Sequence, residues 1–103
     1  MPVGNRIGGE HGAFPIIMSN FASERLMLAG QCVAIAELAY REARRYARER
    51  EAFGKPLAGF QVTRHKLADM ATRIAAIRAL TGEAAVRVAR GEFAPALCAM
   101  AKN

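Results

Sequence analysis

The feature that most constrains this chain is a bend-forming stretch between two long runs of helix-forming sequence. Residues 50–61 read REAFGKPLAGFQ. Gly54 and Gly59 permit backbone angles that a side chain forbids, and Pro56 cannot donate a hydrogen bond within a helix. The stretch therefore predicts the bend of a helical hairpin. Two interpretations of its side chains stay open: a turn whose phenyl rings cap the helix pair, or a ligand-binding set.

The ligand-binding interpretation rests on three side chains of this stretch. Arg50 can bind a phosphate through two hydrogen bonds, Phe53 can pack on a flat ring, and Gln61 offers both a donor and an acceptor. The chain contains no Cys-x-x-Cys or His-Glu-x-x-His pattern and no recognisable Ser-His-Asp set. We therefore expect neither a metal site nor a nucleophilic triad.

Hydrophobic periodicity on both sides of the bend supports the hairpin. The first long helix is expected from about Ala22 to Glu51, and the second from about Phe60 to Arg90. Each carries an apolar seam with steps of three and four residues, which is typical of helices that pack along their length. The first seam comprises Leu26, Ala29, Val33, Ala36, Tyr40, Ala43 and Ala47, and the second comprises Leu67, Met70, Ile74, Ile77, Thr81, Ala84 and Val88.

The remaining segments add little besides helix. Residues 1–12 read as a glycine-rich loop, and a short helix with Pro15 in its first turn is expected from Ala13 to Asn20. Gly91 should end the second long helix, and Pro95 should begin a third helix that is too short to cover the pair. A stripe that flanks the first seam comprises Leu28, Cys32, Ile35 and Ala39. Apolar stripes left bare in this way predict association with another surface.

Composition bounds the class of protein. The 103 residues allow one domain at most, and a hydrophobic content of 52% excludes a disordered chain. No apolar run reaches the roughly 18 residues of a membrane helix, so no membrane contact is expected. The formal charge of +6 favours a polyanionic ligand, either nucleic acid or the phosphates of a nucleotide cofactor. The alternative explanation is that acidic partners are missing. Two cysteines without metal or disulfide spacing, and no visible secretory signal, predict a cytoplasmic protein.

Two stretches carry a family resemblance. Residues 50–70, REAFGKPLAGFQVTRHKLADM, resemble the helix-turn-helix in the C-terminal domain of acyl-CoA dehydrogenases, and residues 20–26, NFASERL, resemble the segment that opens the first long helix of that domain. The resemblance implies an all-α fold, with a long antiparallel helical hairpin plus a short third helix as part of a C-terminal four-helix bundle. Residues 1–21 would be a connecting arm with a short helix, and residues 22–103 a partial bundle domain.

The resemblance also implies FAD as cofactor and the bend as its binding site. In the family, the arginine that ends the first long helix binds the FAD pyrophosphate of a neighbouring subunit, and Arg50 holds that place. Phe53 corresponds to a phenylalanine that lies against the cofactor. Gln61 corresponds to a glutamine that contacts the adenosine end, with Phe60 beside it. Family members form dimers or tetramers through this domain, so the resemblance implies a homo-oligomer.

A second implied set contacts the acyl-CoA substrate, whose α,β-desaturation is the chemistry of the family. Ser23 and Arg25 belong to the segment that touches the substrate. A glutamate removes the α proton while a hydride passes to the flavin. In the isovaleryl- and long-chain-type branches that glutamate lies at the position of Glu24, whereas in most other branches it lies beyond Asn103. Glu24 is therefore a candidate catalytic base, and stabilisation of a helix N-terminus is its alternative role.

Because the resemblance covers only part of a family member, we expect a fragment of an acyl-CoA dehydrogenase that is not an enzyme by itself. Two other classes stay open. One is a stand-alone helical interaction module that assembles through its bare apolar stripes. The other is a nucleic-acid binder, but Tyr40 lies on the apolar seam and Tyr46 flanks it, so aromatic platforms for bases are missing and nucleic acid is not an expected partner.

Overall fold

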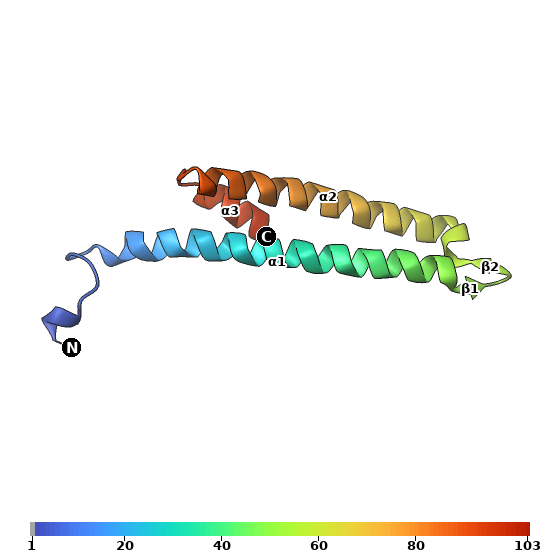
Figure 1. Ribbon diagram of the computed structural model, residues 1–103, viewed down its shortest axis with the longest axis horizontal. Coiled ribbons are helices and arrows are strands. Elements are labelled where there is room, and N and C mark those ends of the chain that lie inside the picture. Colours follow the sequence, from blue (N-terminus) through green and yellow to red (C-terminus); the bar gives the residue numbers. More distant parts are fainter. Residues whose placement is uncertain (1) are drawn as a thin grey trace.

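A computed structural model describes residues 2–103 and shows a helical hairpin with a short third helix (Figure 1). The two long helices are α1 (Ala13–Glu49) and α2 (Gln61–Ala89), and α3 (Pro95–Lys102) lies at the open end of the hairpin, in contact with both. The bend contains two short strands, β1 (Glu51–Ala52) and β2 (Lys55–Pro56), and the 3₁₀ turn η2 (Leu57–Gly59); another such turn, η1, spans Val3–Asn5. The predicted all-α hairpin with a short third helix is confirmed.

The helix boundary expected between Asn20 and Ala22 is wrong. Residues 13–49 form one continuous helix, so the predicted short helix is its first part. Neither Gly nor Pro occurs between Pro15 and Gly30, so nothing in that interval breaks the hydrogen-bond ladder. Pro15 itself lies in the first turn, where its missing N–H has no intrahelical partner to lose.

Both predicted apolar seams face the inside of the hairpin. Every residue of the first seam is buried or half-buried, and so is the second seam except Met70, which is 44% exposed. The contact is built from small side chains: the buried residues among 2–103 are Ala22, Ala29, Ala47, Ala84, Cys98 and Ala101. Leu26, Val88 and Leu97 pack around three of them where α3 joins the hairpin. Small residues let the helices approach closely, but they leave most large apolar side chains outside the contact.

The ends of α2 and α3 follow their sequence signals. Gly91 has a φ of 76°, and its N–H donates to the carbonyl of Val88 at 3.0 Å, while the N–H of Glu92 donates to that of Arg87 at 3.0 Å. This pair of bonds is a Schellman cap, which needs a left-handed residue after the helix. Pro95 opens α3 as predicted. None of the helices within residues 2–103 combines the length and hydropathy that a membrane-spanning helix needs.

Candidate functional site

The bend is a tight two-stranded turn with Phe53 and Gly54 at its tip. Their φ values of 52° and 78° are both left-handed, which is the pattern of the two-residue turns that connect twisted antiparallel strands. Glycine adopts this region freely, but a phenylalanine does so at a steric cost. The Phe53 side chain gains no burial in return, because it is 96% exposed. The turn therefore presents a phenyl ring to the solvent at the far end of the hairpin.

Three of the four residues predicted to bind the cofactor meet in one hollow beside this turn. Phe53, Phe60 and Gln61 line a space of about 360 Å³, together with Ala52, Leu57, Val62 and Thr63. The two rings meet edge to face, with centroids 6.4 Å apart and an interplanar angle of 79°. The Nζ atom of Lys55 lies 4.3 Å from the centroid of the Phe60 ring. The hollow thus combines aromatic walls with a nearby positive charge.

The same hollow lies at the N-terminus of α2. Phe60 is the N-cap residue, and it makes no side-chain capping hydrogen bond. The first backbone N–H bond into the helix comes from Arg64, which donates to the carbonyl of Phe60 at 3.1 Å. The N–H groups of residues 61–63 therefore have no intrahelical partner, and three such groups with the positive end of the helix dipole favour an anion.

Arg50, the fourth predicted residue, ends α1 but is not part of the wall of this hollow. Its backbone holds the bend together: its N–H donates to the carbonyl of Tyr46, and its carbonyl accepts from the N–H of Leu57, both at 2.8 Å. Its side chain is exposed and forms no ion pair with any residue from 2 to 103. A full positive charge is therefore available at the edge of the bend.

The second predicted set, Ser23, Glu24 and Arg25, does not form a cluster. Successive residues of a helix point about 100° apart, so the three side chains leave α1 in three directions. Ser23 lines an open hollow of about 520 Å³ with Pro15, Ile16, Ser19 and Asn20. The guanidinium carbon of Arg25 lies 5.9 Å from the centroid of the Phe21 ring. Asn20, which was not predicted as a site residue, donates from its Nδ2 to Oε1 of Glu24 at 2.8 Å.

The alternative role of Glu24 as a helix N-terminal residue is wrong. Since α1 begins at Ala13, Glu24 lies about three turns into the helix. The stabilisation of a carboxylate by the helix dipole falls off within the first turn. Glu24 is also exposed, and Asn20 is its only side-chain hydrogen-bond partner within the described part of the chain.

The two predicted sets lie far apart. Glu24 and Arg50 are separated by 26 residues of nearly continuous helix, which corresponds to about 39 Å along the axis. The chain therefore brings together three of the four residues predicted to bind the cofactor but keeps them away from the candidate base. One molecule of this shape cannot place both sets on the same reacting atoms.

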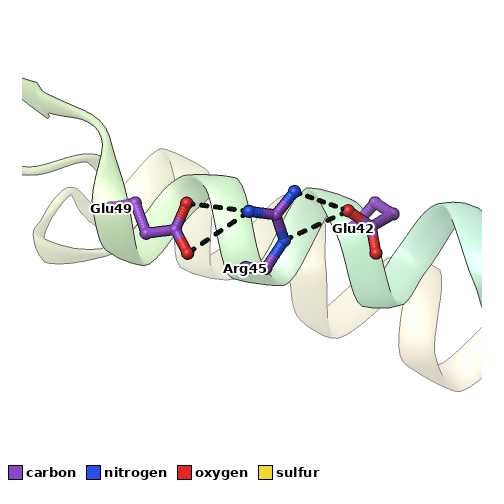
Figure 2. Close-up of polar contacts among 3 residues, drawn as sticks. All are labelled: Glu42, Arg45 and Glu49. Carbon is purple, nitrogen blue, oxygen red and sulfur yellow. Dashed lines mark hydrogen bonds and ion pairs between the residues drawn. The ribbon is translucent and has the colours of Figure 1, made fainter.

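The second half of α1 carries ion pairs that were not predicted from the sequence. Figure 2 shows Arg45 between Glu42 and Glu49, with nitrogen–oxygen distances of 2.8 Å to Glu42 and 3.0 Å to Glu49. The hydrogen bonds and charge of Arg45 lower the pKa of Glu42, and the same contacts raise the pKa of Arg45. Arg78 of α2 forms an ion pair with Glu37 of α1 at 3.2 Å, which is a polar contact between the two long helices.

Comparisons with known proteins place the chain among acyl-CoA dehydrogenases, as its sequence motifs predicted. Residues 11–103 match the family described as acyl-CoA dehydrogenase, C-terminal domain. An acyl-CoA dehydrogenase of Bacillus subtilis is 41% identical over the whole chain, and a cyclohexane-1-carbonyl-CoA dehydrogenase of Geobacter metallireducens is 35% identical over 99% of it; the chain covers 27% of each.

Solved structures give the same result. The butyryl-CoA dehydrogenase of Megasphaera elsdenii superposes on 98% of this chain with a TM-score of 0.90 and 38% identity, and the chain covers 26% of that protein. A probable acyl-CoA dehydrogenase of Mycobacterium abscessus covers the whole chain with a TM-score of 0.87 and 43% identity. The chain thus spans about a quarter of the length of these relatives. It belongs to the acyl-CoA dehydrogenase family and corresponds to the C-terminal domain of that family.

Proposed function

We propose that this chain supplies part of the C-terminal domain of an FAD-dependent acyl-CoA dehydrogenase, which desaturates acyl-CoA thioesters between the α and β carbons. Its contribution is a cofactor-binding bend and a surface for oligomerisation. The observation that carries the proposal is the hollow at the N-terminus of α2, where Phe53, Phe60 and Gln61 meet. Membership of the acyl-CoA dehydrogenase family supports FAD as the proposed ligand of this hollow.

The residues at the bend suit the adenosine diphosphate part of FAD. Unpaired N–H groups at the start of α2 and the free guanidinium of Arg50 favour a pyrophosphate. The rings of Phe53 and Phe60 offer apolar surface for a flat group, and Gln61 can donate to or accept from it. When bound, FAD supplies the hydride acceptor for the desaturation.

Glu24 is the proposed base for the α proton, while Ser23 and Arg25 are proposed to contact the acyl-CoA. Because Glu24 lies about 39 Å from Arg50 along α1, the bend would serve the flavin of a neighbouring subunit. In an assembly of two or four copies of the complete dehydrogenase, the bend of one copy would contribute to the site of another, and this chain alone would not turn over acyl-CoA. A glutamate of another segment is the alternative base, as in the other branches of the family.

Calorimetric titration of the chain with ADP and with FAD tests the assignment of the bend. Weak binding of both is expected, because the hollow covers only part of either ligand. Arg50→Ala should abolish it, and Arg50→Lys should lose nearly as much, since an ammonium cannot form two parallel hydrogen bonds. Gln61→Ala should cost less, about 0.5–1.5 kcal/mol, as expected for one neutral hydrogen bond.

Arg90→Ala is the matched control, because it removes an exposed arginine from the opposite end of α2. It should leave the titration with either ligand nearly unchanged. If the Arg50→Ala chain binds ADP and FAD as well as the parent does, the pyrophosphate is not bound at this bend.

A stand-alone helical interaction module is the second candidate function. Leu28 and Ile35 are 48% and 66% exposed on α1, which favours assembly with other helices whether or not a cofactor binds. The titration separates the two candidates. Self-association without any affinity for ADP or FAD would support the module and contradict the cofactor-binding role.

A further inference from the structure

Three arginines in the second half of α1 form a basic surface that the proposed function does not use. Arg41, Arg44 and Arg48 are exposed, and their spacing of three and four residues places them on one face of the helix. None of them forms an ion pair within residues 2–103. They line a hollow of about 550 Å³ together with Tyr40, Arg45 and Glu49. We propose that this basic surface is a docking site for an acidic segment of another protein.

The acids of α1 that lie beside the basic surface have other partners. Arg45 holds both Glu42 and Glu49, and Figure 2 shows the two carboxylates turned toward its guanidinium. Glu37 lies one turn before Arg41, but it pairs with Arg78 of α2 at 3.2 Å. These contacts engage the acidic groups of this part of α1. The three remaining guanidinium groups therefore keep their hydrogen-bond donors and their charge for a partner.

Several observations favour an acidic polypeptide as the occupant. The basic surface extends from Arg41 to Arg48, which is about 10 Å along the helix axis. Acidic side chains at three- and four-residue spacing on a partner helix cover the same length, so one carboxylate can face each guanidinium. In a symmetric contact a second copy would place its own Arg41, Arg44 and Arg48 against this surface, and these like charges disfavour it as the occupant. The charged residues that line the hollow are all exposed and Tyr40 is half-buried, so the hollow offers no enclosed subsite for a small anion.

Fluorescence anisotropy with a labelled helical peptide tests the proposal. The probe carries glutamates at three- and four-residue spacing on one face, and its control has the same composition with the glutamates spread around the helix. At low salt the one-faced peptide should bind the parent chain more tightly than the control peptide, and added salt should weaken it. The Arg41→Gln/Arg44→Gln/Arg48→Gln variant should bind about tenfold more weakly, a change of about 1.4 kcal/mol.

A charge-matched variant separates a defined surface from general attraction. Arg64→Gln/Lys66→Gln/Arg90→Gln removes the same charge from exposed positions elsewhere and should bind the peptide nearly as the parent does. Circular dichroism checks that each variant is helical. Should the first triple variant fail to fold, Arg44→Gln alone should show a smaller loss in the same direction.

Three results would overturn the docking site. Equal losses in the two triple variants would mean that only net charge matters. Equal affinity for the two peptides would mean that no aligned surface exists. The third result is displacement of the labelled peptide by inorganic triphosphate at a lower concentration than the unlabelled peptide needs. That result would assign the arginines to a phosphate ligand. ADP titration at the bend should be unchanged in the first triple variant, so this test is independent of the cofactor assignment.

Discussion

At the scale of the residue, Phe53 combines two features that oppose stability. Its φ is 52°, and its ring is 96% exposed, so the left-handed backbone costs about 1–2 kcal/mol without burial to offset it. Asparagine adopts this region readily, and Asn-Gly is a preferred pair for a two-residue hairpin turn. We expect Phe53→Asn to raise the free energy of unfolding by about 1 kcal/mol in urea denaturation.

Phe93→Asn provides the control for that prediction. Phe93 is 71% exposed but has no positive φ, so its replacement should not stabilise the chain. An equal gain at both positions would show that the backbone at Phe53 carries no strain. If Phe53 contacts FAD, its replacement should also weaken the titration with FAD, and stability and binding would then change in opposite directions.

The sequence predicted the bend from Gly54, Gly59 and Pro56, but it could not predict the conformation of Phe53. A bulky residue argues against the left-handed region, so residue type alone points the wrong way. Phe53 and Gln61 were predicted from their side-chain chemistry and Phe60 from the family resemblance. That the three line one hollow at the N-terminus of α2 depends on the geometry of the bend, which residue types alone do not give. The alternative role of Glu24 at a helix N-terminus was wrong because α1 begins at Ala13 and not near Ala22.

At the scale of the element, one glycine inside α2 and one just after it are expected to respond oppositely to substitution by alanine. Gly91 has a φ of 76° after the helix, whereas Gly82 lies inside it, and a Cβ added there meets nothing within 4 Å. Gly91→Ala should therefore lower stability by about 1–2 kcal/mol through backbone strain. Gly82→Ala should raise it by about 1 kcal/mol through helix propensity. Thermal unfolding followed by circular dichroism measures both, and a stabilising Gly91→Ala would contradict the Schellman cap.

The seams show why the elements were easier to predict than their boundaries. A period of 3.5 residues over seven positions identifies a helix face whatever its ends do. Residues 20–26 resemble the segment that opens the first long helix of the family domain, and this resemblance suggested a start that the structure does not have. The backbone hydrogen-bond ladder continues through this segment as part of α1.

At the scale of the whole molecule, the chain is extended. Its radius of gyration is 20.9 Å, and its dimensions are 74 × 29 × 17 Å. A compact domain of this length has a radius of gyration of about 13 Å. Phe14, Phe21, Leu28 and Ile35 follow one another at seven-residue intervals along α1, and all are exposed, by 68%, 40%, 48% and 66%. A hairpin of this shape has no second layer to cover them.

Self-association through this exposed apolar stripe is the corresponding prediction. Burial contributes about 25 cal/mol per Å², so several hundred Å² of apolar surface per chain can outweigh the entropy lost on association. Light scattering at micromolar concentration should show a dimer or tetramer. Leu28→Glu/Ile35→Glu should shift it toward the monomer, because two carboxylates cannot be buried without partners. Val86→Glu, at a position on α2 that is 46% exposed, should leave the assembly unchanged. A folded monomer for the parent chain would contradict the prediction, since the stripe would then be stable in water.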